Sequence, residues 1–174
     1  MIERQTLRKY LKMKYDIIDN FLDKEQFKKI KNKLLHYNFG WFLSHDVAGT
    51  DNGNKEHYNF THNFYEHYKI NSEVFSDLLF IINKLEVKSL LRIKANLYPK
   101  TAKIIEHDFH SDYKFSHKSA LYMINTNNGF TILKDGEKIE TKENRMLLFD
   151  ASKQHKSTTC TDDIYKCNII FNYF

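Results

Sequence analysis

Residues 90–99, LLRIKANLYP, are the part of the sequence that decides the fold. Apolar residues occupy every second position, with polar or aromatic residues between them, so the stretch predicts a β-strand with one face in a core. The apolar face consists of Leu91, Ile93, Ala95 and Leu97. Further strand patterns follow over residues 119–124, 129–134, 137–141, 145–149 and 164–173. Short strands in such close succession are typical of a sandwich, jelly roll or barrel.

Two helices are predicted on the N-terminal side of this strand. Residues 23–37 carry an apolar stripe at helical spacing, and Asp23 followed by Gln26 has the spacing of a capping box. Residues 73–85 form a second helical pattern with a broad apolar face. The polar segment 44–60 contains two of the five glycines and is predicted to be a long loop.

Turn signals divide the C-terminal half into hairpins. Asn127-Asn128-Gly129 and Asp135-Gly136 are residue combinations that favour tight turns between strands. Because the predicted helices come first and the strands later, the class is α+β. We expect one domain over residues 1–174, in which 1–89 supply helical and loop support and 90–174 form the β core.

Composition excludes several classes of protein. Hydrophobic residues make up 41% of the 174 residues and aromatic residues 15%, which is enough for a folded core. The net charge of +5 comes from 23 lysines and only 4 arginines, which indicates a solvated surface rather than an arginine-rich nucleic-acid face. No apolar run is long enough to cross a membrane. Cys160 and Cys167 cannot form a disulfide framework, and the first residues lack an apolar leader, so we expect a cytoplasmic protein.

The candidate chemistry begins with His110-Ser111-Asp112. In an extended segment, residues two apart point to the same side, so an imidazole and a carboxylate can bind one metal ion together. This triplet alone is a weak signal. His155 follows a predicted strand further along the chain, and two histidines with one carboxylate form the facial triad of non-haem Fe(II) sites. Such a triad leaves metal positions open for a co-substrate and O₂.

The order His110-x-Asp112, His155 and Lys166 resembles the 2-oxoglutarate- and Fe(II)-dependent dioxygenases, and in particular the prolyl hydroxylases. Four segments between about residue 90 and residue 174 match that family in order. They are ANLYP before HSD, ALYMIN with NNGFT, RMLLFD with QH, and KCNIIFNYF at the end. The resemblance implies a double-stranded β-helix core of the jelly-roll or cupin type, with the N-terminal helices packed on one sheet.

The resemblance also implies a role for individual residues. His110, Asp112 and His155 would be the Fe(II) ligands, and Lys166 would bind the distal carboxylate of 2-oxoglutarate. Three further residues match positions that contact the co-substrate in some branches of the family: Asn96, Tyr98 and Asn168. The implied reaction uses O₂ and 2-oxoglutarate, releases succinate and CO₂, and hydroxylates a C–H bond of an unidentified protein, peptide or small-molecule substrate.

Three departures from the family pattern are visible. Most relatives have arginine at the position of Lys166. Met123 occupies the position of a tyrosine that contacts 2-oxoglutarate in prolyl hydroxylases. Asn172 stands where the nucleic-acid demethylase branch has a second arginine, which disfavours a nucleic-acid substrate.

Two other classes remain open from the sequence: a non-oxidative, cupin-like metal-binding jelly roll and a lectin-like binding module. The remaining histidines are not expected to be ligands. His107 is interpreted as a loop residue or as a donor behind the site. His57, His62 and His67 recur every five residues and share no face of a helix or strand, so they are assigned surface or loop roles. Residues 44–63 and 113–118 are expected to overhang the pocket.

Overall fold

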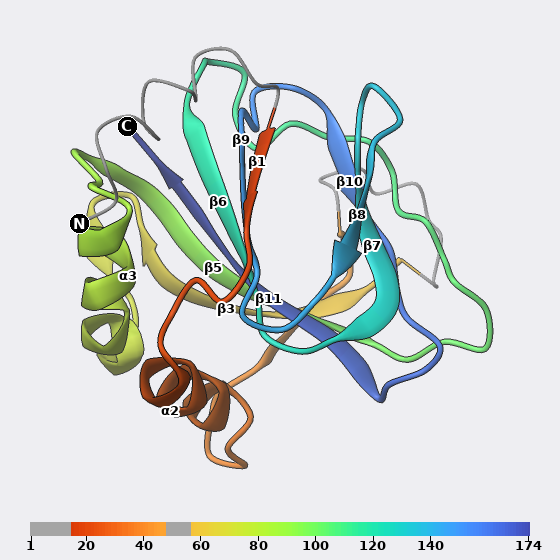
Figure 1. Ribbon diagram of the computed structural model, residues 1–174, viewed down its shortest axis with the longest axis horizontal. Coiled ribbons are helices and arrows are strands. Elements are labelled where there is room, and N and C mark those ends of the chain that lie inside the picture. Colours follow the sequence, from red (N-terminus) through yellow and green to blue (C-terminus); the bar gives the residue numbers. More distant parts are fainter. Residues whose placement is uncertain (1–14, 48–56) are drawn as a thin grey trace.

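A computed structural model describes residues 15–47 and 57–174 of the protein. Two antiparallel sheets make up most of this structure (Figure 1). The larger sheet runs in the order β1 (Tyr15–Ile18), β9 (Met146–Phe149), β6 (Lys118–Met123), β11 (Tyr165–Tyr173), β5 (Leu90–Pro99), β3 (Asn59–Glu66) and β2 (Phe42–Ser44), with β4 (Lys69–Ile70) paired to β3. The smaller sheet runs in the order β10 (His155–Ser157), β7 (Asn127–Leu133) and β8 (Lys138–Thr141).

The apolar residues form two core layers. One layer lies between the larger sheet and the helical segments, which are α2 (Lys24–Leu34), η1 (Glu73–Leu78) and α3 (Leu79–Lys84). The other layer lies between the two sheets. Figure 1 shows both helices on one side of the larger sheet and β7, β8 and β10 on the other. The prediction of a double-stranded β-helix with helices packed on one sheet is therefore confirmed.

Strand β5 shows how alternation assigns residues to the two layers. Ile93 and Ala95 are fully buried against the helices. Lys94, Asn96 and Tyr98 lie on the opposite face of the same strand, which borders the space between the sheets. Strand β11 pairs with β5 along its whole length and places Asn168 opposite Asn96.

The helix predictions are partly confirmed. Asp23 is the N-cap of α2, and its carboxylate accepts a hydrogen bond of 2.9 Å from the backbone N–H of Gln26. The helix ends at Leu34, earlier than the predicted residue 37. The second predicted helix begins as the 3₁₀ segment η1 and becomes α-helical only over α3.

The N-terminal half contains strands that the sequence pattern does not predict. β2 and β3 include both ends of the segment expected to be a loop, and its centre, 48–56, lies outside the described residues. β3 was missed because its register shifts between Asn63 and Tyr65, which interrupts the period-two pattern. Its residues are also polar, although Phe64 is fully buried.

Of the two predicted hairpin turns, one is confirmed. Asp135-Gly136 connects β7 to β8, and Gly136 has a φ of +93°, which favours glycine. Asn127-Asn128-Gly129 is not a turn, because β7 already begins at Asn127. Gly129 is needed for another reason: a Cβ there would lie 2.6 Å from the carbonyl oxygen of Thr159 and 3.0 Å from Cδ of Lys166.

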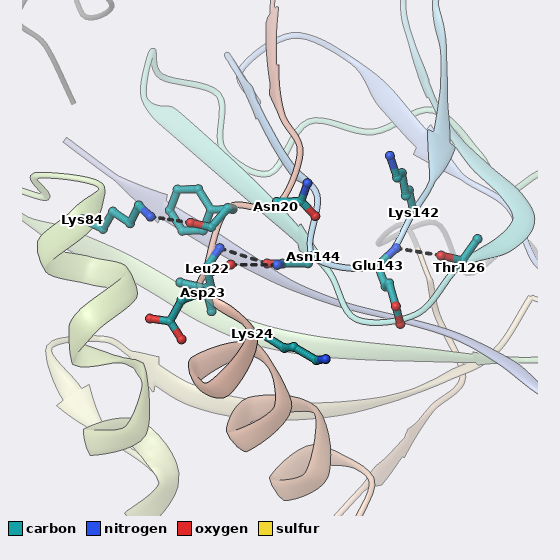
Figure 2. Close-up of a pocket in the computed structure, with 10 residues that line it drawn as sticks. Asn20, Leu22, Asp23, Lys24, Lys84, Thr126, Lys142, Glu143 and Asn144 are labelled. Atoms are coloured by element: carbon teal, nitrogen blue, oxygen red, sulfur yellow. Dashed lines mark hydrogen bonds between the residues drawn. The ribbon is translucent and has the colours of Figure 1, made fainter. Parts of the chain in front are cut away.

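Hydrogen bonds from the side chain of Asn144 connect the segment before α2 to the turn before β9. Its side-chain amide donates to Leu22 O and accepts from Leu22 N, both at 2.9 Å (Figure 2). It also accepts a 2.7 Å hydrogen bond from the hydroxyl of Tyr122. Figure 2 also shows Lys84 of α3 reaching the backbone carbonyl of Phe21. These contacts hold both helices against the larger sheet, so the strands behind them are fixed in place.

Candidate metal centre

The His110–Asp112 segment is held on the strand that carries His155 by backbone hydrogen bonds. His110 N donates to His155 O at 3.0 Å, and His155 N donates to His110 O at 2.9 Å. Asp112 N donates to Ala151 O at 3.0 Å. The two segments are thus paired as in an antiparallel sheet, although they lie 45 residues apart. This pairing brings the side chain of His155 to those of His110 and Asp112.

The three side chains offer one ligand atom each, and these atoms lie within 4.8 Å of one another. The rings of His110 and His155 have centroids 4.6 Å apart. Nδ1 of His110 faces the carbonyl of Asp108 at 3.4 Å, and Nδ1 of His155 faces that of Lys153 at 3.2 Å. A carbonyl at Nδ1 leaves Nε2 of each ring for a metal ion, the usual arrangement of a ligating histidine. The donor set of two nitrogens and one carboxylate fits Fe(II).

The charges at the three residues suit a divalent cation. Burial lowers the pKa of His155 to about 4 and also lowers that of His110, so both rings are neutral at pH 7. Burial alone would raise the pKa of Asp112. His155, which is protonated only at the low pH where Asp112 titrates, the charge of Arg92 and a hydrogen bond from Asn172 outweigh this effect and keep the pKa of Asp112 below its ordinary value. The centre therefore presents two neutral imidazoles and one carboxylate anion.

Two neighbouring strands orient the carboxylate. Nη2 of Arg92, on β5, donates to Oδ1 of Asp112 at 3.0 Å. Nδ2 of Asn172, on β11, donates to Oδ2 at 2.7 Å and also to Oγ of Ser119 at 2.7 Å. Asn172 was singled out from the sequence only as a departure from a nucleic-acid-modifying branch. The structure gives it a positioning role that the spacing of residues could not reveal.

A cleft leads from the triad along the inner faces of β5 and β11. Its lining includes Asn96, Tyr98 and Asn168, three of the predicted co-substrate residues. Nδ2 of Asn96 donates to Oδ1 of Asn168 at 3.1 Å, so the two amides form a cross-strand pair. Tyr98 is 6% exposed, and its burial raises its pKa to about 12. These residues line the cleft rather than the outer surface of the sheet.

Lys166 lies on β11 opposite Tyr98 and is 1% exposed. Its ammonium donates to Phe130 O at 2.8 Å, Ser157 Oγ at 3.0 Å and Thr158 O at 3.1 Å. All three acceptors are neutral, and no carboxylate is among its partners in the described part of the chain. Burial therefore lowers the pKa of Lys166 to about 7. A buried ammonium with only neutral partners is suited to bind an anion.

Similarity to known proteins appears at the level of structure and not of sequence. No protein-family model and no curated protein sequence matches the chain. An oxidoreductase of the 2OG-Fe(II) oxygenase family from Burkholderia pseudomallei superposes with a TM-score of 0.67 at 10% identity, covering 97% of this chain and 89% of that one. A prolyl-4-hydroxylase from Pseudomonas putida gives 0.66 at 10% identity, covering 97% of both chains. HygX from Streptomyces hygroscopicus, solved with nickel and 2-oxoglutarate, gives 0.65 at 10% identity, covering 99% and 87%.

The fold is that of the 2-oxoglutarate- and Fe(II)-dependent oxygenases. The chain combines this fold with the cluster of His110, Asp112 and His155. The resemblance predicted from residues 90–174 is confirmed at the level of the fold, and the structural similarity extends over 97% to 99% of the chain.

Three polar residues near the cleft were not predicted as residues of the site. Thr131 lines the cleft, and its buried hydroxyl has no hydrogen-bond partner among the described residues. His107 is 2% exposed and stacks on Tyr98, with ring centroids 5.3 Å apart. Burial lowers its pKa to about 4. Lys94 lines the cleft close to the triad. The sequence offers one signal for Lys94: it lies two residues before Asn96 and therefore on the same face of the predicted strand.

The remaining residues and segments named from the sequence lie partly inside and partly outside the cleft. Met123 is buried between the sheets. Residues 113–118 lie beside the triad, where the ring of Tyr113 lies under Arg92, and no residue of the segment lines the cleft. Of residues 44–63, Val47 reaches the cleft lining. His62 contacts Gly40 O and Ser72 Oγ and is therefore structural. The pocket in Figure 2 shares no lining residue with the cleft.

Cys160 and Cys167 are both buried and unbridged. Within residues 15–47 and 57–174, no helix has the length and apolar character to cross a membrane.

Proposed function

We propose that the protein is a 2-oxoglutarate- and O₂-dependent Fe(II) dioxygenase that hydroxylates a C–H bond of its substrate. In the overall reaction, substrate, 2-oxoglutarate and O₂ become hydroxylated substrate, succinate and CO₂. The observation that carries the proposal is the convergence of His110, Asp112 and His155 at one cleft, together with the buried ammonium of Lys166, which lies behind the cleft lining and donates to Ser157 Oγ. The metal supplies the redox chemistry when it is bound.

The chain's own residues have separable roles in this proposal. His110, Asp112 and His155 would hold Fe(II) through two imidazole nitrogens and one carboxylate. Arg92 and Asn172 fix the orientation of the Asp112 carboxylate. Apolar packing excludes water, since the ring of Phe149 meets that of His155 edge to face with centroids 4.9 Å apart.

The far end of the cleft would bind the distal carboxylate of 2-oxoglutarate. Lys166 would provide the charge, and a carboxylate oxygen would replace one of its neutral acceptors. Tyr98, Asn96 and Asn168 would donate or accept hydrogen bonds along the molecule. Ser157 contacts Lys166 and lines the cleft, so it lies where the ammonium and the ligand would meet.

A non-oxidative, cupin-like metal protein and a lectin-like module are less well supported. A buried ammonium without a carboxylate partner costs free energy when no anion binds to it. Neither of these two functions requires such a group near the metal cleft. We further propose that residues 1–174 act as one oxygenase domain in the cytoplasm, where Cys160 and Cys167 stay reduced. A protein, a peptide or a small molecule remains the proposed substrate.

The decisive experiment is anaerobic addition of 2-oxoglutarate to the Fe(II)-loaded protein, followed by admission of O₂. A visible charge-transfer band and subsequent succinate release are the expected results. The matched control is Asp112→Ala, which removes one of three protein ligands. A protein that binds Fe(II) but gives neither the band nor succinate would be a metal-binding jelly roll instead.

A further inference from the structure

Lys94 is a partly buried lysine that lines the cleft, and neither the triad nor the co-substrate site accounts for it. It lies on the inner face of β5, in the same row as Arg92, Asn96 and Tyr98, and it lines the cleft next to His110 and Asp112. In the part of the chain that the structure describes, its ammonium has neither a hydrogen-bond acceptor nor a carboxylate within ion-pair distance. An inert strand position facing a core would carry an apolar side chain.

The acidic groups near Lys94 are occupied by other donors. Both oxygens of Asp112 already accept hydrogen bonds, from Arg92 and from Asn172. Glu66 accepts a hydrogen bond of 2.6 Å from Asn63. Burial, followed by the charge of Arg92, lowers the pKa of Lys94 to about 8, and the opposing effects of Asp112, Glu66 and Asp46 are smaller. These three carboxylates therefore offset the effect of burial and of Arg92 only in part.

The other cations near the cleft already have partners. Lys156 forms an ion pair of 2.6 Å with Glu106 at the surface. Arg92 is bound to Asp112. The ammonium of Lys166 has three acceptors and lies behind Ser157. Lys94 is thus the one cation of the cleft lining, among the described residues, whose charge has no partner.

The position of Lys94 along the sheet separates it from the co-substrate end. Lys94 pairs with Ile170 in the β5–β11 register, whereas Lys166 pairs with Tyr98. Four residues along a strand span roughly 13 Å. The distal carboxylate of 2-oxoglutarate cannot meet both ammonium groups. The row instead places Lys94 beside the metal ligands, where a substrate approaches.

We propose that Lys94 binds a carboxylate of the substrate, so that the substrate is an acid with its carboxylate close to the carbon that is oxidised. This inference rests on the proposed function. A single ammonium with no second free cation beside it matches a singly charged carboxylate better than a phosphate dianion, which is bound by several donors. Binding would also give the partly buried ammonium a counter-ion in direct contact.

The test uses protein loaded with Zn(II) and N-oxalylglycine, an unreactive analogue that fills the 2-oxoglutarate site. The NMR signal of the Lys94 side chain, assigned from its loss in Lys94→Met, is followed during titration with acetate and, separately, with the neutral isostere acetamide. We expect a saturable shift with acetate and none with acetamide. Lys69→Met, which removes an exposed lysine of β4, should leave the Lys94 response unchanged.

A second measurement uses turnover. Peptides and amino acids are supplied in pairs that differ only in carboxylate versus amide, and stimulated succinate release is recorded. We expect the acid member to be preferred, and Lys94→Met to lower kcat/KM for it by at least about tenfold.

Three results would overturn the assignment. If the Lys94 signal moves when N-oxalylglycine binds and then ignores acetate, Lys94 belongs to the co-substrate site. If neither acetate nor N-oxalylglycine moves it, the residue is structural. If inorganic phosphate binds and acetate does not, the substrate is a phosphate ester. Failure of the proposed function is a separate outcome, because N-oxalylglycine would then not bind to the metal-loaded protein.

Discussion

One variant, Lys166→Met, tests both the role of Lys166 in 2-oxoglutarate binding and the free-energy cost of burying the Lys166 ammonium. Methionine keeps an unbranched stem of similar length beside Gly129 and removes only the ammonium. Because the pKa of Lys166 is lowered from 10.5 to about 7, the folded protein loses this proton at a pH at which the unfolded chain still holds it. The unfolded state thus binds more protons between pH 7 and 10.5, so the stability of the parent should rise with pH in that window.

The size of the effect follows from the lowered pKa. Between pH 7 and pH 9, a group that titrates at about 7 when folded and at 10.5 when unfolded adds about 2 kcal/mol to the free energy of unfolding. Lys166→Met should lack this increase, whereas Lys69→Met should retain it. Urea unfolding at several pH values measures the difference. Parallel pH profiles for Lys166→Met and the parent would show that the ammonium is not held at a lowered pKa.

The same group sets the pH dependence of 2-oxoglutarate binding. At pH 7, Lys166→Met should weaken binding by about 2–4 kcal/mol, or about 30- to 1000-fold, since one partner of a buried charge pair is lost. Above pH 7, binding to the parent must take up a proton, so its affinity should fall about 50-fold by pH 9. The variant should show no such decline. Anaerobic calorimetry of the Fe(II) protein gives both values, and an unchanged affinity in Lys166→Met would remove this residue from the site.

Three further predictions concern the metal centre and its support. His110→Ala, Asp112→Ala and His155→Ala should each abolish Fe(II)-dependent succinate release while the fold persists in circular dichroism, because each removes one of three ligands; turnover at the parent rate would misplace the centre. Asn172→Ala should lower Fe(II) affinity about 10- to 100-fold in a chelator competition, because Asp112 loses its Oδ2 donor, and an unchanged affinity would deny the positioning role. Gly129→Ala should destabilise the protein by about 1–3 kcal/mol, because the added Cβ collides with Thr159 O; an unaltered unfolding midpoint would show that β7 yields without strain.

The sequence by itself indicated most of the C-terminal strands, although not β10, and the three residues of the candidate metal centre. Strand β5 was predictable because its apolar residues alternate, and β9 and β11 because they are short runs rich in apolar residues; both patterns are local properties of the chain. The HSD triplet was visible because its two ligands are neighbours in sequence. Its assignment as a metal site, together with His155, depended on resemblance rather than on spacing.

Only the tertiary structure decided which polar groups act on one another. Arg92, Asn172 and Asp112 come from three separate segments and meet because β5, β11 and the HSD segment are adjacent in space. The role of Gly129 likewise depends on the backbone carbonyl of Thr159, which passes it 30 residues later. A turn signal and a close backbone approach both require glycine, so the residue type alone cannot distinguish them.

The strands of the N-terminal half were missed for a related reason. β1 pairs with β9, and β3 pairs with β5, so each is a strand because of a partner more than twenty-five residues away. β3 is polar and bulged, and its extended conformation is stabilised by backbone hydrogen bonds to its neighbours rather than by its own side-chain pattern. The surroundings of Lys94 and Lys166 also emerge only in three dimensions. Whether a lysine has a counter-ion depends on every segment packed around it, and the sequence specifies those neighbours only through the complete fold.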